Sequence, residues 1–537
     1  MGENKKINFI FKKAYYLFLL ILLFSCQYEK HRDFNIIMIS LDTTRFDYID
    51  SGKGALAKTP ALKKFAKDSI VFENAFCTCP ETLPSHLSVF TSRMPHELKV
   101  FNNSDIYGGS YKMIHQVLRK KGFHTSAIIS LGTLDSETGI KPGFIDFDDN
   151  LFEKEIFFVP AEKVTERAIK KINNFKSRNF FLFIHYSDPH TPYAPPEAES
   201  PFEIYLDGTM VSNFNAYTGA ILRKKISLAR GSHLMEFRVR NNFEDFTHFI
   251  LRRLCFSKEC TVRSNTLQKK DSEYRDAYHL NDDQGRIQID CDKEGYVELF
   301  QVIPILNQKS ALKLYRQEVE YMDQSLGELF KHIEKSNRFK QTVIVIFGDH
   351  GEGHGERDGF FGHTKYVNRQ FIQVPLIMRI PNMGNKRFES PVSLDCLSPT
   401  LLEYLKIHSQ SIPWKKSILN EIKEKKINKK NICSFAFKPS ARFNTLSLIR
   451  WPFQGVVYWD KGEVKRWEFF NLKRSKAFNE QDVVDREDLS RYSEDMYARL
   501  MRDIKEMREE ISLSFGTKKE PSEKILEKIR TLGYVGK

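Results

Sequence analysis

The sequence predicts an α/β protein in which a mostly parallel sheet is flanked by helices. Three short apolar runs, Asn35–Leu41, Phe180–His185 and Val343–Phe347, each stop abruptly at polar residues. Such runs are typical of strands that are buried on both faces of a parallel sheet. Segments with helical periodicity lie between them, and this alternation favours an α/β sheet over the other fold classes.

The remaining elements of the core are expected in the following order. A helix and then a strand lie within Thr59–Phe72, and a turn followed by a helix is expected at Thr82–Arg93. Further elements are an amphipathic helix at Tyr111–Lys121, a strand at His124–Ser130, a helix at Val164–Phe175 and a strand at Val374–Ile380. Apolar residues spaced three and four apart from Leu312 to Ile333 indicate a helix whose stripe faces the core rather than a cofactor.

At 537 residues the chain exceeds one ordinary domain. Residues 33–199 and 309–410 are expected to form two parts of one core, interrupted at 200–308 by a β-rich module. There apolar Met235 and Phe237 alternate with charged neighbours, which predicts a small sandwich. The module could bind a polymer, or it could only form one wall of the functional site. Residues 411–537 predict a smaller α+β subdomain, with strand character at 463–472 and an amphipathic helix at about 487–512.

Residues 1–25 have the pattern of an export signal. Four lysines precede the apolar run Ala14–Phe24, which is too short to span a bilayer as a helix. The run ends in Leu-Phe-Ser-Cys26 and resembles a bacterial lipoprotein signal, which implies lipidation of Cys26 and attachment to the bacterial cell membrane. A plain signal peptide or a short anchor is the alternative, and each of the three predicts export.

Charge and cysteine content restrict the partners further. The net charge of +14 suits an anionic substrate or an anionic lipid surface. We find no nucleic-acid motif and expect no nucleic-acid partner. Apart from Cys26 there are seven cysteines, an odd number that cannot all pair within the chain. Cys255 and Cys260 are close enough in sequence to bridge.

Acidic residues and a histidine follow two of the predicted inner strands. Asp42 comes directly after the first strand, and Asp349 and His350 follow Val343–Phe347 about 300 residues later. Ligands of open α/β sheets bind where the strands end, so these side chains are expected to converge. Two carboxylates and an imidazole suit a divalent cation such as Zn²⁺, Mn²⁺ or Mg²⁺.

Three further residues could act on a bound anion. Thr82 opens a helix, and its hydroxyl could be deprotonated by a metal ion close to a helix N-terminus that favours anions. His190 and His363 could contact a tetrahedral anion or protonate a leaving group. Each histidine alone is more often an ordinary polar residue, so the combination carries the prediction.

Several motifs occur together in an order that resembles the sulfatase family of the alkaline-phosphatase-like superfamily. They are LDTTRFD (41–47), TLPSHLSVFTSR (82–93), YSDPHTPYAPP (186–196), YRQEVEYMDQSLGEL (315–329) and FGDHGE (347–352). The resemblance covers roughly 33–196 and 311–405. It implies an alkaline-phosphatase-like fold with one or two divalent ions (Zn, Mn, Mg or Ca). The implied roles are metal ligands Asp42, Asp349 and His350, nucleophile and further ligand Thr82, substrate contacts His190 and His363, and supporting charges Arg45 and Lys365.

The chain departs from the family's pattern at the nucleophile. Formylglycine sulfatases carry Cys-x-Pro-Ser-Arg or Ser-x-Pro-Ser-Arg, whereas this chain has Thr82-Leu-Pro-Ser-His86, and Thr43 replaces the usual second aspartate. It resembles the branch with an unmodified threonine, which implies phosphodiester hydrolysis or phospho-group transfer on a lipid head group, a glycan or a small molecule. The alternatives are a sulfuric ester hydrolase acting on sulfated glycans and a catalytically silent surface binding lipoprotein.

Overall fold

The computed structural model describes residues 34–150, 159–175, 179–191, 193, 195–196, 202–214, 221–239, 246–269, 277–280, 284–357, 359–412, 416–426, 432–436, 444–461, 463–473 and 494–513. The predicted export signal and Cys26 lie outside these residues. Within the described part, no helix is both long enough and apolar enough to cross a membrane.

The core is a nine-stranded sheet whose central strand, β1 (Asn35–Leu41), lies between β16 (Thr342–Gly348) and β5 (Phe180–Tyr186). Both neighbours run parallel to β1. The strand order is β20-β2-β19-β16-β1-β5-β3-β4, and β21 also pairs with β2. The remaining strands of this sheet are β2 (Ile70–Phe76), β3 (His124–Ile128), β4 (Asp146–Asp148), β19 (Gln373–Arg379), β20 (Lys386–Phe388) and β21 (Val392–Ser393). Because only β19 runs antiparallel to its neighbours, the predicted mostly parallel sheet is confirmed.

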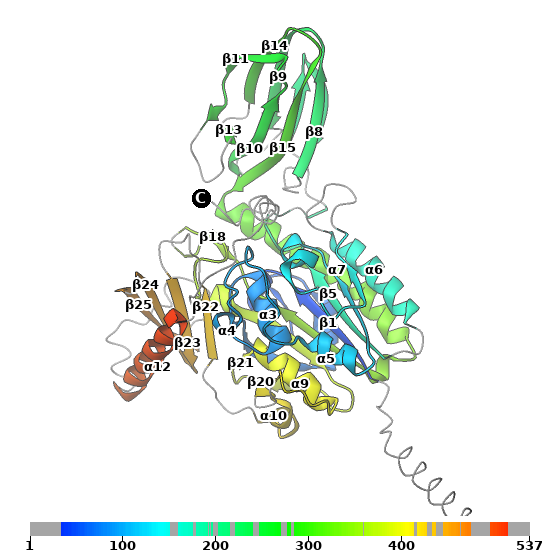
Figure 1. Cartoon of the computed structure of the whole chain (residues 1–537), viewed down its shortest axis with the longest axis vertical. Coiled ribbons are helices and arrows are strands. Elements are labelled where there is room, and N and C mark those ends of the chain that lie inside the picture. Colours follow the sequence, from blue (N-terminus) through cyan, green and yellow to red (C-terminus); the bar gives the residue numbers. More distant parts are fainter. Residues whose placement is uncertain are drawn as a thin grey trace, which may run out of the picture.

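Helices cover both faces of this sheet (Figure 1), as a doubly buried sheet requires. Ile36 and Met38 of β1 pack toward α3 (Thr82–Thr91), α5 (Ile114–Lys120) and α9 (Leu397–Tyr404). Ile37 and Ile39 face α2 (Pro60–Lys67), α6 (Ala161–Asn174) and α7 (Gln308–Lys335). Shorter helices are α4 (Pro95–Leu98), α8 (Arg369–Ile372), α10 (Leu419–Lys423) and the 3-10 turns Phe46–Tyr48, Gly132–Leu134, Ser136–Thr138, Phe339–Gln341 and Leu394–Cys396. A short hairpin pairs β17 (Gly353–His354) with β18 (Phe361–Gly362).

The inserted module is a sandwich of two five-stranded sheets that stands beyond the core at the end where α7 begins (Figure 1). Met235 and Phe237 point into its apolar core, as the alternating pattern predicts. One sheet has the order β11-β14-β9-β6-β7 and the other β12-β13-β10-β15-β8. The strands are β6 (Phe202–Leu206), β7 (Thr209–Phe214), β8 (Ile221–Leu228), β9 (Gly231–Val239), β10 (Phe246–Phe256), β11 (Cys260–Asn265), β12 (Gln268–Lys269), β13 (Ala277–Leu280), β14 (Gln284–Cys291) and β15 (Gly295–Leu306).

The disulfide of this module differs from the expected one. Cys260 bonds to Cys291, while Cys255 is a free thiol, so the expected Cys255–Cys260 bridge is wrong. The reason is strand register: Cys260 and Cys291 face each other across antiparallel β11 and β14, with Cα atoms 4.1 Å apart. Cys255 lies on β10, in the other sheet.

The C-terminal subdomain is a four-stranded antiparallel sheet with one long helix packed against it. Its strands are β22 (Ile432–Ala436), β23 (Asn444–Arg450), β24 (Phe453–Asp460) and β25 (Glu463–Asn471), and the helix is α12 (Glu494–Leu513). Leu500 and Ile504 of α12 are buried against the sheet. The sequence predicts a smaller α+β subdomain in this part of the chain, and the structure confirms it.

Candidate active site

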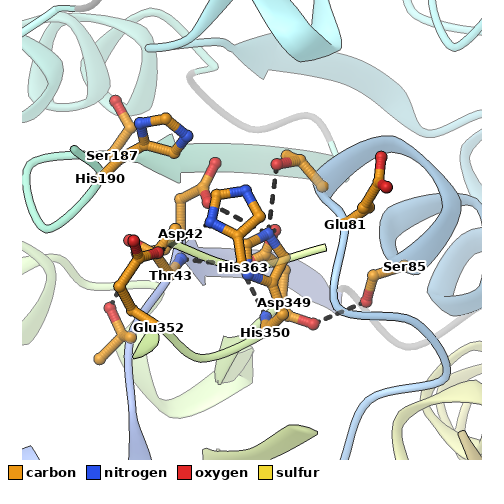
Figure 2. Close-up of polar contacts among 12 residues, drawn as sticks. Asp42, Thr43, Glu81, Ser85, Ser187, His190, Asp349, His350, Glu352 and His363 are labelled. Carbon is orange, nitrogen blue, oxygen red and sulfur yellow. Dashed lines mark hydrogen bonds and ion pairs between the residues drawn. The ribbon is translucent and has the colours of Figure 1, made fainter. Parts of the chain in front are cut away.

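The register of β1 and β16 brings the predicted metal ligands together. Leu41 is paired with Gly348, so the next residues, Asp42 and Asp349, leave the sheet side by side, and His350 follows. All three side chains are fully buried, and one ligand atom from each lies within 4.8 Å of the others. Figure 2 shows Asp42, Asp349 and His350 grouped at this edge.

The carboxylates of Asp42 and Asp349 each have one oxygen that accepts a hydrogen bond and one oxygen without a partner among the described residues. Asp349 Oδ1 accepts from the backbone N–H groups of Thr43 (3.1 Å) and His350 (2.8 Å), and Asp42 Oδ2 lies 3.0 Å from Nε2 of His185. Asp42 Oδ1 and Asp349 Oδ2 are buried and have no hydrogen-bond partner among the described residues. These oxygens lie 3.6 Å and 3.4 Å from His350 Nε2. Two orphaned carboxylate oxygens beside a ring nitrogen fit a divalent cation.

The electrostatics of the cluster agree with that donor set. Burial raises the pKa of Asp42 well above its usual range, and the nearby charge of Glu352 raises it further. Burial, and then the charge of Asp42, raises the pKa of Asp349. Burial also lowers the pKa of His350, which keeps the imidazole neutral as a ligand must be. Two like charges buried together are unfavourable unless a cation compensates them.

Thr82 lies against this cluster at the first position of α3. Its Oγ1 is 3.3 Å from His350 Nε2, and the side chain is fully buried. Ser85, one turn later, donates to the backbone oxygen of Asp349 (2.7 Å). His86 contacts the Thr82 carbonyl through Nδ1 and Ser40 Oγ through Nε2, both at 2.7 Å. These bonds hold the start of α3 against the carboxyl ends of β1 and β16.

The two predicted histidines meet beside the cluster. The rings of His190 and His363 are 5.3 Å apart between centroids, and His363 lies 4.3 Å from the ring of His350. Glu352 orients His363 through a 2.8 Å contact between Oε2 and Nδ1. Burial lowers the pKa of His190 to about 3, so its ring is neutral in the structure.

The two residues predicted as supporting charges, Arg45 and Lys365, differ in their burial. Arg45 is buried, and its guanidinium forms ion pairs with Asp47 and Glu356 and lies 3.1 Å from Nδ1 of His354. These contacts bind the turn after Asp42 to the hairpin that precedes His363. Lys365 is exposed, with its ammonium 4.9 Å from the ring centroid of Tyr366. A supporting charge at Lys365 stays a prediction.

Comparison with known proteins assigns the family. A family model described as Sulfatase matches residues 34–407, which is more than half of the chain. The chain belongs to the sulfatase family. It is 22% identical to an N-acetylglucosamine-6-O-sulfatase of Bacteroides thetaiotaomicron over 411 residues, 70% of this chain and 69% of that protein.

Solved structures agree with this fold. The structure of BT4656 in complex with its substrate D-glucosamine-2-N,6-O-disulfate has a TM-score of 0.60 at 15% identity, covering 92% of this chain and all of that one. The phosphonate monoester hydrolase of Silicibacter pomeroyi has a TM-score of 0.55 at 14% identity, covering 90% of this chain and 96% of that one. The sulfatase-family fold predicted from the sequence is therefore confirmed.

Sequence reasoning missed three polar residues of this sulfatase-family site. His185 touches Asp42, and its position as the polar end of an apolar strand was the available signal. Glu352 lies three residues after Asp349, within the FGDHGE motif. Tyr315 belongs to the apolar stripe of α7, yet its hydroxyl donates to the backbone oxygen of Thr43 (2.7 Å). The helical periodicity of the sequence indicates that the Tyr315 side chain faces the core, but it does not indicate what the hydroxyl contacts.

Proposed function

We propose that this sulfatase-family protein cleaves or transfers phosphoric esters, with an unmodified Thr82 as its nucleophile. The observation that carries the proposal is the position of the Thr82 hydroxyl, buried and 3.3 Å from His350 Nε2, beside the two open carboxylate oxygens. A hydroxyl placed beside a cluster of metal-ligating groups is suited to attack a tetrahedral anion.

The neighbouring residues have separate roles in this reaction. The Thr82 hydroxyl loses its proton to solvent, and its oxygen bonds to phosphorus as the bond to the leaving oxygen breaks. His363, oriented by Glu352, supplies a proton to that leaving oxygen, while the neutral His190 contacts the substrate. Water or an acceptor hydroxyl then attacks the phospho-threonine and releases Thr82. Asp42, Asp349 and His350 would hold a divalent cation, which supplies charge neutralisation and lowers the pKa of a bound hydroxyl.

The residue type at position 82 favours phosphorus over sulfur. A threonine alkoxide can be displaced from phosphorus by water, whereas a sulfated threonine lacks the hydrate chemistry by which formylglycine expels sulfate. The fold accommodates such substrates, since a phosphonate monoester hydrolase shares it. A sulfuric ester of a glycan is the second candidate, because an N-acetylglucosamine-6-O-sulfatase is among the sequence relatives.

The proposed setting is the bacterial cell envelope. The signal-like residues 1–25 and Cys26 support export and a lipid anchor, and the net charge of +14 supports an anionic ester substrate. That substrate would be a lipid head group, a glycan or a small molecule. Loss of labelled palmitate incorporation in Cys26→Ala would support the anchor, and unchanged incorporation would contradict it.

Parallel assays of residues 27–537 test the reaction. Bis-p-nitrophenyl phosphate, p-nitrophenyl phosphate and p-nitrophenyl sulfate are compared after Mn²⁺ or Zn²⁺ loading. We expect phosphodiester turnover that falls at least about 1,000-fold in Thr82→Ala. Thr91→Ala, which removes a buried hydroxyl from the other end of α3, is the matched control. Sulfate turnover that depends on Thr82 would favour the second candidate, and a chain that neither binds metal nor turns over any ester would favour the silent binding protein.

A further inference from the structure

Tyr315, in the third turn of α7, contacts the turn that follows Asp42. Its hydroxyl donates to the Thr43 carbonyl (2.7 Å) and accepts from the Arg45 N–H (2.9 Å). The side chain is fully buried, and its ring packs edge-on against Tyr48 at a centroid distance of 4.7 Å. One phenol oxygen therefore spans the turn that follows Asp42.

That turn has an unfavourable backbone conformation. Thr43 has a φ of +51°, in the left-handed region that a β-branched residue rarely adopts. Such a conformation costs of the order of 1–3 kcal/mol and persists only where its surroundings enforce it. The backbone of this turn also passes very close to the end of β16. A Cβ atom added at Gly348 would lie only 2.7 Å from the carbonyl oxygen of Thr44, so the close approach requires a glycine there.

Thr43 links both carboxylates of the cluster. It directly follows Asp42, and its backbone N–H donates to Asp349 Oδ1 (3.1 Å). This bond occupies one oxygen of Asp349 and leaves the other open toward His350. A displaced Thr43 would therefore disturb Asp42 through the chain and Asp349 through the lost hydrogen bond.

The helix that carries Tyr315 is itself fixed. Asp323, two turns further along α7, accepts from the backbone N–H groups of Ala61 (2.9 Å) and Leu62 (2.8 Å) at the start of α2. Val319 and Met322 of α7 are buried in the same apolar cluster as Leu62 and Phe65 of α2. The phenol is thus presented to the turn from a rigid element, which is what precise positioning requires.

We propose that Tyr315 is a positioning residue for the metal centre, acting by holding Thr43 in its left-handed conformation. This inference rests on the metal site of the proposed function but not on the ester that is cleaved. Groups that orient metal ligands typically change metal affinity 10- to 100-fold when they are removed. Tyr315 would therefore set affinity for the cation without touching it.

Chelator competition with Mn²⁺ and Zn²⁺ on residues 27–537 tests this. Tyr315→Phe keeps the ring and removes the hydroxyl, and we expect metal affinity to fall about 10- to 100-fold. Tyr186→Phe is the matched control, since it removes another fully buried hydroxyl, whose 2.8 Å partner is Thr165 Oγ1 on α6. Affinity within twofold of wild type in Tyr315→Phe, or an equal loss in Tyr186→Phe, would overturn the proposal.

A double-mutant cycle separates positioning from general destabilisation. Glycine adopts a positive φ without strain, so the effect of Tyr315→Phe on metal affinity should shrink in a Thr43→Gly background. Additive effects would contradict the proposed link through Thr43. A wild-type chain that binds neither metal would overturn the metal site together with this inference.

Discussion

His185 lies with Nε2 3.0 Å from Oδ2 of Asp42, and this contact determines which oxygen of the carboxylate faces the cluster. A carboxylate oxygen accepts, so Nε2 carries the proton, and Nδ1 faces the hydroxyl of Ser130 at 3.2 Å. The other oxygen, Oδ1, is left open beside His350.

Replacing His185 by phenylalanine should therefore weaken metal binding. We expect about a 10- to 100-fold loss of Mn²⁺ or Zn²⁺ affinity, because Asp42 loses the group that orients it. Chelator competition at pH 8 measures it. His115→Phe is the matched control, a buried histidine bound to the Ile140 carbonyl and stacked on Phe144. Equal affinities in the two variants would contradict the role of His185.

His115 also makes stability depend on pH. Burial lowers its pKa to about 3, while an unfolded histidine titrates near 6.5. Its contribution to stability is therefore fully present above pH 6.5 and is lost as pH falls from 6.5 toward 3. In His115→Phe the free energy of unfolding should fall less steeply below pH 6, by up to about 1.4 kcal/mol per pH unit. Denaturant titrations at pH 5, 6 and 8 measure this, and parallel slopes would refute it.

Removing the metal should expose the cost of the buried carboxylates. Asp349→Asn abolishes one of two like charges, so we expect the metal-free variant to be about 1–2 kcal/mol more stable than metal-free wild type. Added Mn²⁺ should stabilise the wild type and leave the variant unchanged. Thermal unfolding with and without EDTA provides the comparison, and a metal-free variant less stable than wild type would contradict the explanation.

A buried ion pair joins the active-site hairpin to the C-terminal subdomain. Arg357, between β17 and β18, pairs with Glu468 of β25, which also accepts from the Tyr458 hydroxyl (3.1 Å). Glu468→Leu leaves the buried guanidinium without this carboxylate and should cost about 3–5 kcal/mol. The double variant with Arg357→Leu should recover most of that loss. Urea unfolding measures both, and a double variant as unstable as Glu468→Leu would argue against the pair.

The convergence of the candidate metal-binding residues could be predicted because parallel strands of one sheet end at the same edge. Asp42 and Asp349 end neighbouring parallel strands, and apolar runs with polar ends reveal such strands in the sequence. His185 lies one residue before the end of β5, on the other side of β1, but the sequence does not state which strand lies beside which. The role of Tyr315 depends on the length of a phenol and the path of a turn, which periodicity does not encode.

The disulfide illustrates the same limit. Spacing along the chain favours Cys255 with Cys260, whereas the bond forms between Cys260 and Cys291. Their pairing depends on the register of β11 against β14, which only the folded sandwich fixes. Local separation is a poor guide where antiparallel strands bring distant residues opposite one another.

The placement of β1 has a consequence for how the chain is made. Its neighbour β16 pairs Thr342 with Asn35, 307 positions away, so at about 5–20 residues per second the ribosome supplies it about 15–60 s after β1. During that interval β1 can pair with β5, but its other edge is open and apolar on both faces, the kind of edge that recruits foreign strands. All strands of the sandwich precede β16 in the chain, so the sandwich can be complete by then. Until β16 has emerged, that edge leaves the newly made chain open to pairing with other strands.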